Sequence, residues 1–244
     1  MIQFHVRIAN LNFKIFCRYP TIQFICEDFI SQSSASDCII MASQEDIEKE
    51  WKRSPNFDGS NNSLRRKSYE PILEARAIYR KICELLSDNN IIAMHGAVVS
   101  YKSESYMFTA PSGTGKTTRA LYFLKQFPGS VILNGDKPFI RFEKERAIIC
   151  GTPWMGKENY GINAESPLKA IFFLERAKET RLFNMTFSEA LPNLLKQVYI
   201  PEQPDNKHII HLLQCLNEKV AFYRFLSSNS CDSVMEAWSY ANKL

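Results

Sequence analysis

Thr109-Ala110-Pro111-Ser112-Gly113-Thr114-Gly115-Lys116-Thr117 is the stretch that decides the fold of this chain. Residues 110–117 follow the phosphate-binding pattern G-x-x-x-x-G-K-[ST], except that Ala110 replaces the first glycine, a change that a negative φ would tolerate. The apolar residues 106–109 predict a strand before the loop, and residues 117–127 predict a helix after it. This order indicates an α/β nucleotide-binding domain. The alternative is a glycine-rich turn that precedes Lys-Thr by chance.

The residue types of the loop suit a bound triphosphate. Gly113 and Gly115 let backbone N–H groups curl around phosphate oxygens, because no Cβ stands in the way. Lys116 brings a positive charge to the terminal phosphates, and the hydroxyl of Thr117 is a ligand for Mg²⁺. ATP and Mg²⁺ are therefore the expected cofactors. The predicted nucleotide-binding residues are Ser112, Gly113, Thr114, Gly115, Lys116, Thr117 and Thr118.

A carboxylate for the metal follows the next predicted strand. Residues 131–133 are apolar, and Asp136 comes directly after Asn134-Gly135. Ligands of parallel sheets bind at the carboxyl ends of the strands, which is where Asp136 is expected. Asp136 is predicted to hold Mg²⁺ together with Thr117, or to take the proton of a hydroxyl acceptor. The alternative is an ordinary turn, since Asn-Gly-Asp is a good turn sequence.

Two further segments carry candidate site residues. His95 interrupts the apolar run 91–99, and it is either a satisfied core histidine or a site residue near the phosphates. Residues 151–159 contain two glycines, a proline and a tryptophan, which indicates a shaped loop. There Lys157 is a candidate phosphate contact and Glu158 a candidate second metal ligand. The alternative is a structural turn in which Trp154 packs.

The chain is predicted to contain a small N-terminal subdomain, residues 1–68, and a core, residues 69–244. Strands are expected at 2–8 and 11–17. A helix is expected from the cap formed by Ser43 and Asp46 to about Lys52, and a second helix is expected at 70–88. Beyond these elements, further strands are expected at 91–99, 105–109, 131–134, 139–142, 147–150 and 169–174, and helices at 188–199, 206–216 and 232–242.

The segment 52–67 is turn-rich and basic. It holds five basic residues against Asp58, a charge of +4. The segment is either a solvated loop or a basic arm that guides an acidic substrate or peptide.

Composition excludes several classes of protein. The 244 residues are 45% hydrophobic and 23% charged, which excludes a disordered chain, a collagen and a disulfide scaffold. No apolar run reaches the roughly 18–20 residues of a membrane span, and no signal peptide is recognised. The net charge of +4 does not imply nucleic-acid binding. Seven irregularly spaced cysteines indicate reduced thiols in a cytoplasmic protein. From the apolar runs and the net charge, neither a membrane nor a nucleic acid is expected as a partner.

These motifs together resemble a known family. The sequence resembles the catalytic domain of HPr kinase/phosphorylase in four segments: Met94-His95-Gly96, the loop 110–117, Asn134-Gly135-Asp136 and Gly151-Thr152-Pro153-Trp154. The core of that domain is similar to that of ATP-dependent phosphoenolpyruvate carboxykinase. Within this resemblance, the four segments are closer to a set of HPr-kinase-like proteins, some of which are encoded with peptide-modifying enzymes such as those of lasso peptides. The resemblance covers roughly residues 69–200.

The resemblance implies a P-loop core of this type. The small N-terminal α+β subdomain, residues 1–68, is predicted from its own strands and helix and resembles no known family. The resemblance also implies transfer of the ATP γ-phosphate to a hydroxyl, a serine by analogy, with Asp136, Lys116 and His95 as catalytic residues. Gly135 stands where the family has the first aspartate of a pair, and the family's later Arg-Pro-Gly-Arg segment is missing, so phosphorolysis is not expected. HPr kinases are hexamers, but no residue here carries that homo-oligomeric state over.

Three functions compete on this sequence. The first is an ATP- and Mg²⁺-dependent kinase whose substrate is a hydroxyl-bearing peptide, protein or small molecule. The second is a non-catalytic nucleotide-binding sensor or partner subunit, which Ala110 and Gly135 favour. The third is a P-loop ATPase that drives conformational work; the sequence shows no apolar strand that ends in Asp-Glu to support it.

Overall fold

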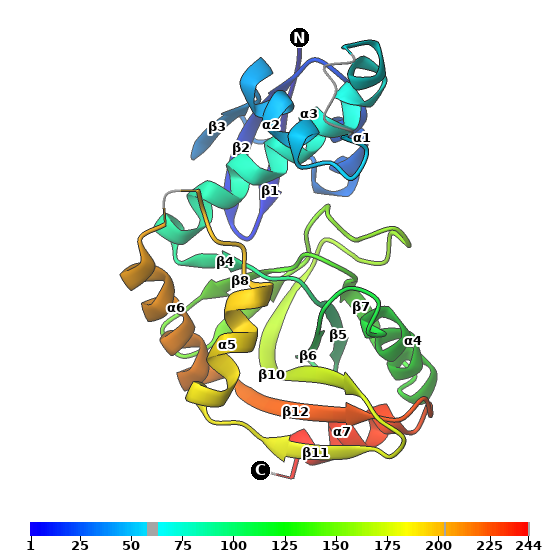
Figure 1. The fold of residues 1–244 in the computed structure, drawn as a ribbon. Coiled ribbons are helices and arrows are strands. Elements are labelled where there is room, and N and C mark those ends of the chain that lie inside the picture. Colours follow the sequence, from blue (N-terminus) through cyan, green and yellow to red (C-terminus); the bar gives the residue numbers. More distant parts are fainter. Residues whose placement is uncertain (58–62, 203, 244) are drawn as a thin grey trace. The chain divides into compact units, whose positions relative to one another are not determined.

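A computed structural model describes residues 1–57, 63–202 and 204–243 of the chain, apart from the side chains of 63–65. The chain divides into an N-terminal unit, Met1–Leu85, and a C-terminal unit, Leu86–Leu244 (Figure 1). The division expected after residue 68 falls inside α3 (Ser63–Leu86), which begins before the expected start at residue 70. Because α3 is one continuous helix, the two units divide near its end.

The N-terminal unit combines a three-stranded sheet with helices. β1 (Ile2–Ile8) and β2 (Leu11–Cys17) form an antiparallel hairpin, and β3 (Cys38–Met41) lies parallel to β2. The helices are α1 (Thr21–Ile25), α2 (Gln44–Lys52) and α3, with a 3₁₀ turn at Glu27–Phe29. The predicted capping box of Ser43 and Asp46 is confirmed, and α2 ends at Lys52 as expected. Residues 58–62 of the basic segment lie outside the described residues, so its role stays a prediction.

The C-terminal unit is built on a nine-stranded mixed sheet of order β4-β8-β9-β10-β6-β5-β7, with β12 beside β10 and β11 beside β12. β10 is long: its first residues pair antiparallel with β9, and its later ones lie between the parallel strands β6 and β12. The strands are β4 (Ile91–Ala93), β5 (Ala97–Tyr101), β6 (Glu104–Thr109), β7 (Val131–Asn134), β8 (Phe139–Phe142), β9 (Ala147–Cys150), β10 (Glu165–Arg176), β11 (Arg181–Asn184) and β12 (Ala221–Ser227).

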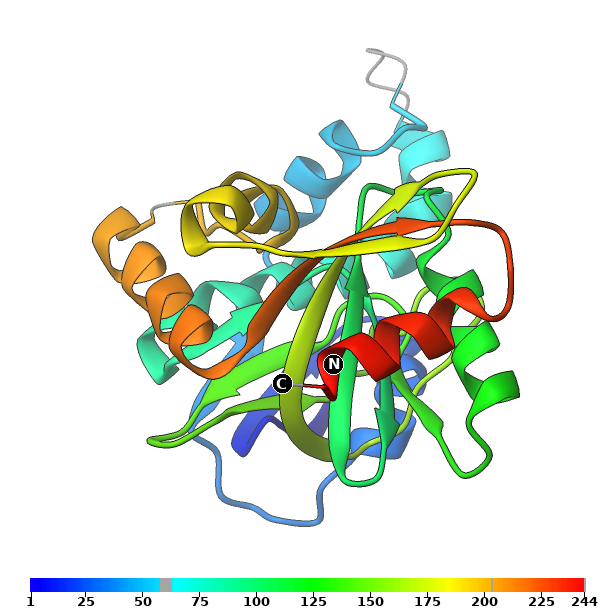
Figure 2. The same cartoon turned by 90° about the horizontal axis from the view of Figure 1, so that it is seen from below.

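Helices cover both faces of this sheet. α4 (Lys116–Gln126) and α7 (Ser233–Ala241) pack in one apolar cluster, and α5 (Phe187–Gln197) and α6 (Asn206–Lys219) pack in another (Figure 2). β10 contributes Phe172 to the first cluster and its neighbours Ile171 and Phe173 to the second, as alternation along a strand requires. The expected α/β class is confirmed. None of the helices in the described ranges combines the length and apolar composition that a membrane span requires.

The continuous strand expected over residues 91–99 is wrong. Residues 91–93 pair with β8, whereas residues 97–101 pair with β6 and β7. Between them the backbone N–H groups of Met94 and Gly96 donate to the carbonyls of Pro138 and Asp136 in the turn after β7, whereas that of His95 donates to the carbonyl of Gln197. The chain therefore changes partners at His95.

Candidate functional site

The topology brings three predicted site segments to one edge of the sheet. β5 is antiparallel to both β6 and β7, so β6 and β7 run in the same direction. The loop after β6, the turn after β7 and the residues before β5 therefore meet at that edge (Figure 1). These segments carry Lys116, Asp136 and His95.

The loop itself lies between β6 and α4, as the sequence predicts. Gly113 and Gly115 have φ angles of +79° and +112°, which side chains of L-residues disfavour, so both positions require glycine. Ala110 is buried and does not have a positive φ, so its methyl group is accommodated in the apolar cluster under α4. Ser112 and Gly113 are exposed, and Thr117 and Thr118 are half-buried at the start of α4.

Lys116 folds back over this loop. Its Nζ donates to the carbonyl oxygens of Ala110 at 2.9 Å and Pro111 at 3.3 Å. Burial lowers the pKa of the Lys116 ammonium group, and the charge of Asp136 partly offsets this effect. The ammonium group is thus held at the mouth of the loop by weak neutral acceptors, which an anionic phosphate can replace.

Asp136 and His95 face each other beside the loop. Nε2 of His95 lies 3.2 Å from Oδ1 of Asp136, and Nδ1 lies 3.0 Å from Oε1 of Gln197. Burial acts to raise the pKa of Asp136, but the hydrogen bond and electrostatic interaction with His95 and the positive charges of Lys137 and Lys116 outweigh it and hold this pKa below its usual value. Asp136 is therefore ionised at neutral pH.

Asn134 organises the turn that carries Asp136, a role not predicted from the sequence. Its buried side chain accepts the backbone N–H groups of Asp136 at 2.9 Å and Lys137 at 2.8 Å. Its amide group donates to the carbonyl and hydroxyl oxygens of Thr152. Asn134 thereby ties the turn to the loop that begins at Gly151. The signal was present, because asparagine often accepts backbone N–H groups two or three residues ahead in a turn.

That second loop packs tightly against Gly135. A Cβ added to Gly135 would lie 2.8 Å from the carbonyl oxygen of Met155 and 3.1 Å from that of Tyr160. An aspartate therefore does not fit here without a shift of the loop. A Cβ on Gly156 would lie 3.1 Å from Cβ of Asp136 and 3.8 Å from Oε2 of Glu158, so both carboxylates flank one glycine. Lys157 is exposed and makes no hydrogen bond or ion pair with the described residues.

The donor set fits Mg²⁺ bound together with phosphates. The described residues hold no group of three or more histidine, cysteine or carboxylate side chains that could form a metal cage. Mg²⁺ commonly keeps water ligands and uses one or two carboxylates with substrate phosphate oxygens. The site offers the same kinds of ligand. They are the carboxylate of Asp136, with that of Glu158 nearby, and the hydroxyl of the half-buried Thr117 at the start of α4.

An arginine reaches the loop from the neighbouring strand. Arg176, at the end of β10, donates through Nη2 to the carbonyl oxygen of Gly113 at 2.5 Å and through Nε to that of Thr114 at 3.3 Å. Arg181, in contrast, pairs with Glu179 on the exposed hairpin. Arg176 is therefore a residue of the site, and Arg181 belongs to the surface.

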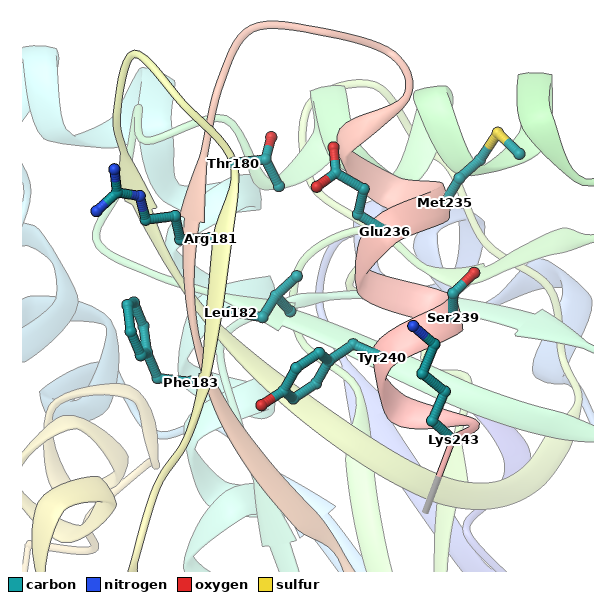
Figure 3. A pocket seen from close by; sticks show the side chains of 9 residues that line it. All are labelled: Thr180, Arg181, Leu182, Phe183, Met235, Glu236, Ser239, Tyr240 and Lys243. Carbon is teal, nitrogen blue, oxygen red and sulfur yellow. The ribbon is translucent and has the colours of Figure 1, made fainter.

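A large groove lies elsewhere in the C-terminal unit. It measures about 600 Å³ between residues 180–183, around β11, and helix α7, where Leu182 and Tyr240 line it (Figure 3). None of the predicted site residues lines this groove. It is therefore distinct from the candidate site around Lys116, Asp136 and His95.

Comparisons with known proteins give structural likenesses without a match in sequence. No protein-family model and no curated protein matches the chain. Among solved structures, the Hpr(Ser) kinase/phosphatase from Coxiella burnetii is similar with a TM-score of 0.30 and 10% sequence identity, over 62% of this chain and 96% of that one. The function is inferred below from the residues of the site.

Proposed function

We propose that this protein is an ATP- and Mg²⁺-dependent kinase that transfers the γ-phosphate to a hydroxyl group. The observation that carries the proposal is the meeting of the loop lysine Lys116, the ionised Asp136 and His95 at one edge of the sheet. Phosphoryl transfer requires mainly positioning and charge neutralisation, and these residues supply both. Seven free thiols and the use of ATP suit a protein of the cytoplasm.

In this proposal each residue has a defined task. The loop N–H groups and Lys116 hold the β- and γ-phosphates, and Lys116 exchanges the carbonyls of Ala110 and Pro111 for phosphate oxygens. Thr117 and Asp136 would hold Mg²⁺, which neutralises phosphate charge. Asp136 orients the acceptor hydroxyl. As the acceptor oxygen bonds to the γ-phosphorus and the bond to ADP breaks, the hydroxyl proton passes to the Asp136 carboxylate.

The acceptor is proposed from the sequence motifs. Their resemblance to kinases encoded with peptide-modifying enzymes makes a serine-containing peptide the first acceptor to test, followed by proteins and small hydroxyl compounds. The specific alternative is a nucleotide-binding sensor or partner subunit. The tight packing at Gly135 favours the sensor or partner subunit, because it leaves no room for a second metal-binding carboxylate directly before Asp136 in the chain.

The test is transfer of label from γ-³²P-ATP with Mg²⁺ to the contents of a source-cell lysate. Lys116→Ala should abolish labelling. Asp136→Asn should lower it by about 10²- to 10⁴-fold while calorimetry still detects ATP binding. Lys125→Ala is the matched control, because Lys125 lies exposed in the last turn of α4 and its side chain makes no hydrogen bond or ion pair with the described residues.

The outcomes separate the three functions. Label that depends on Lys116 and Asp136 supports the kinase. ATP binding without labelled acceptor supports the sensor, and steady ATP hydrolysis without an acceptor supports a P-loop ATPase. Full labelling by the Asp136→Asn variant would contradict the role given to Asp136.

A further inference from the structure

Gln197 is the last residue of α5, and its backbone is fixed to the segment that carries His95. The N–H of His95 donates to the carbonyl of Gln197 at 2.8 Å, and the N–H of Tyr199 donates to the carbonyl of Ala93 at 2.9 Å. Met94 and Val198 form an antiparallel bridge between these two bonds. A residue 102 positions away along the chain is thus held beside His95.

The helix that ends at Gln197 is itself rigidly anchored. A capping box of Thr186 and Glu189 starts α5, and Ala190 and Leu194 are fully buried in the apolar core of the C-terminal unit. The position of Gln197 therefore follows from packing and not from a flexible loop.

The side chains of Gln197, His95 and Asp136 form a row. Oε1 of Gln197 lies 3.0 Å from Nδ1 of His95, and Nε2 of His95 lies 3.2 Å from Oδ1 of Asp136. A carboxylate only accepts hydrogen bonds, so Nε2 of His95 carries the hydrogen that faces Asp136, and the carboxamide of Gln197, which has both an acceptor oxygen and a donor nitrogen, is the partner of Nδ1. This bond fixes the plane of the imidazole and directs Nε2 at the carboxylate.

We propose that Gln197 is a positioning residue for phosphoryl transfer, which acts through the ring of His95 on the carboxylate of Asp136. The proposal rests on the proposed kinase function. Because the ring engages Oδ1, Oδ2 of Asp136 is the oxygen left for the acceptor hydroxyl or the metal. Gln197 has no hydrogen bond to the loop residues 110–118, so it affects the transfer step and not the binding of ATP.

The decisive variant is Gln197→Met, which keeps the length of the side chain and removes the carboxamide that faces Nδ1 of His95. We expect kcat to fall by about 10- to 100-fold, with KM and Kd for ATP changed less than about twofold. Gln197→Glu keeps the acceptor oxygen and should restore most of kcat. Lys196→Met is the matched control, since Lys196 is exposed and its side chain makes no hydrogen bond or ion pair with the described residues.

A double-mutant cycle tests the path of the effect. In the His95→Asn background, Gln197→Met should cause no further loss of kcat, because both changes break the same row. Losses that multiply, or a matching change in Kd for ATP, would overturn the proposal.

Nuclear magnetic resonance of ¹⁵N-histidine-labelled full-length protein supplies a readout independent of transfer. His95→Asn identifies the His95 signals. In the unliganded wild type and in Lys196→Met the ring should carry a hydrogen on Nε2, and Gln197→Met should change the ring nitrogen shifts. Unchanged shifts in Gln197→Met would refute the positioning role even if the protein is a kinase. Changed shifts without any transfer would leave the contact valid and contradict the kinase function instead.

Discussion

Gly135 is enclosed by backbone on two sides, and this decides how the site differs from the family that its motifs resemble. A Cβ at this position would lie 2.8 Å from one carbonyl oxygen and 3.1 Å from another. We expect Gly135→Ala and Gly135→Asp each to destabilise the protein by about 1–3 kcal/mol, because the loop 151–161 must shift. Urea unfolding measures this loss. Wild-type stability for Gly135→Asp, together with tighter Mg²⁺-ATP binding, would show that the position accepts the missing carboxylate.

Single residues also show how far the sequence predicts the site. The loop residues 112–118, Asp136 and His95 could be proposed from motif and spacing, because phosphate chemistry restricts which residue types can follow one another. Gln197 could not, since only tertiary packing of α5 brings it to His95. Arg176 could not be assigned to the site either, because the register between β10 and β6 decides which part of the loop its side chain reaches.

At the scale of elements, β10 lies on one side of β6 and β7 lies on the other, beyond β5. If the γ-phosphate of ATP faces Asp136 after β7, the nucleoside end extends toward Arg176 after β10. We expect Arg176→Met to weaken ATP binding by about tenfold, the loss of one charged hydrogen bond, and to leave inorganic tripolyphosphate binding nearly unchanged. Calorimetry with both ligands checks this, with Arg181→Met as control. An equal loss for both ligands would mean that Arg176 only holds the loop.

The elements were predicted unevenly for physical reasons. Regular apolar patterns predicted several elements close to their observed bounds. These are the strands before and after the loop and the helices 188–199, 206–216 and 232–242. β12 was not predicted: the exposed Arg224 interrupts its apolar run, and its ion pair with Glu175 of β10 exists only once the strands pair. The break at His95 was also missed, because an apolar run does not reveal a change of strand partner.

At the scale of the whole molecule, each unit has a core of its own, and all residues assigned to the site lie in the C-terminal unit. Trp51 is 4% exposed and packs against Leu73 and the rings of Phe57 and Tyr69 in the N-terminal unit. Phe123 is 1% exposed on α4, whose first residue is Lys116. Replacing each of these two aromatic residues by alanine therefore removes a buried ring from the core of one unit only, so that the effects on the two units can be compared.

We expect Trp51→Ala and Phe123→Ala each to cost about 3–5 kcal/mol in the unit that contains it. Phe123→Ala should also weaken ATP binding, because the cavity loosens the helix that presents Lys116 and Thr117. Trp51→Ala should leave the Kd for ATP within about twofold of the wild type, because its core supports none of the loop contacts. Urea unfolding followed by calorimetry on the full chain measures both effects. Equal losses of ATP affinity would contradict this division of labour and would make the N-terminal unit part of the nucleotide site.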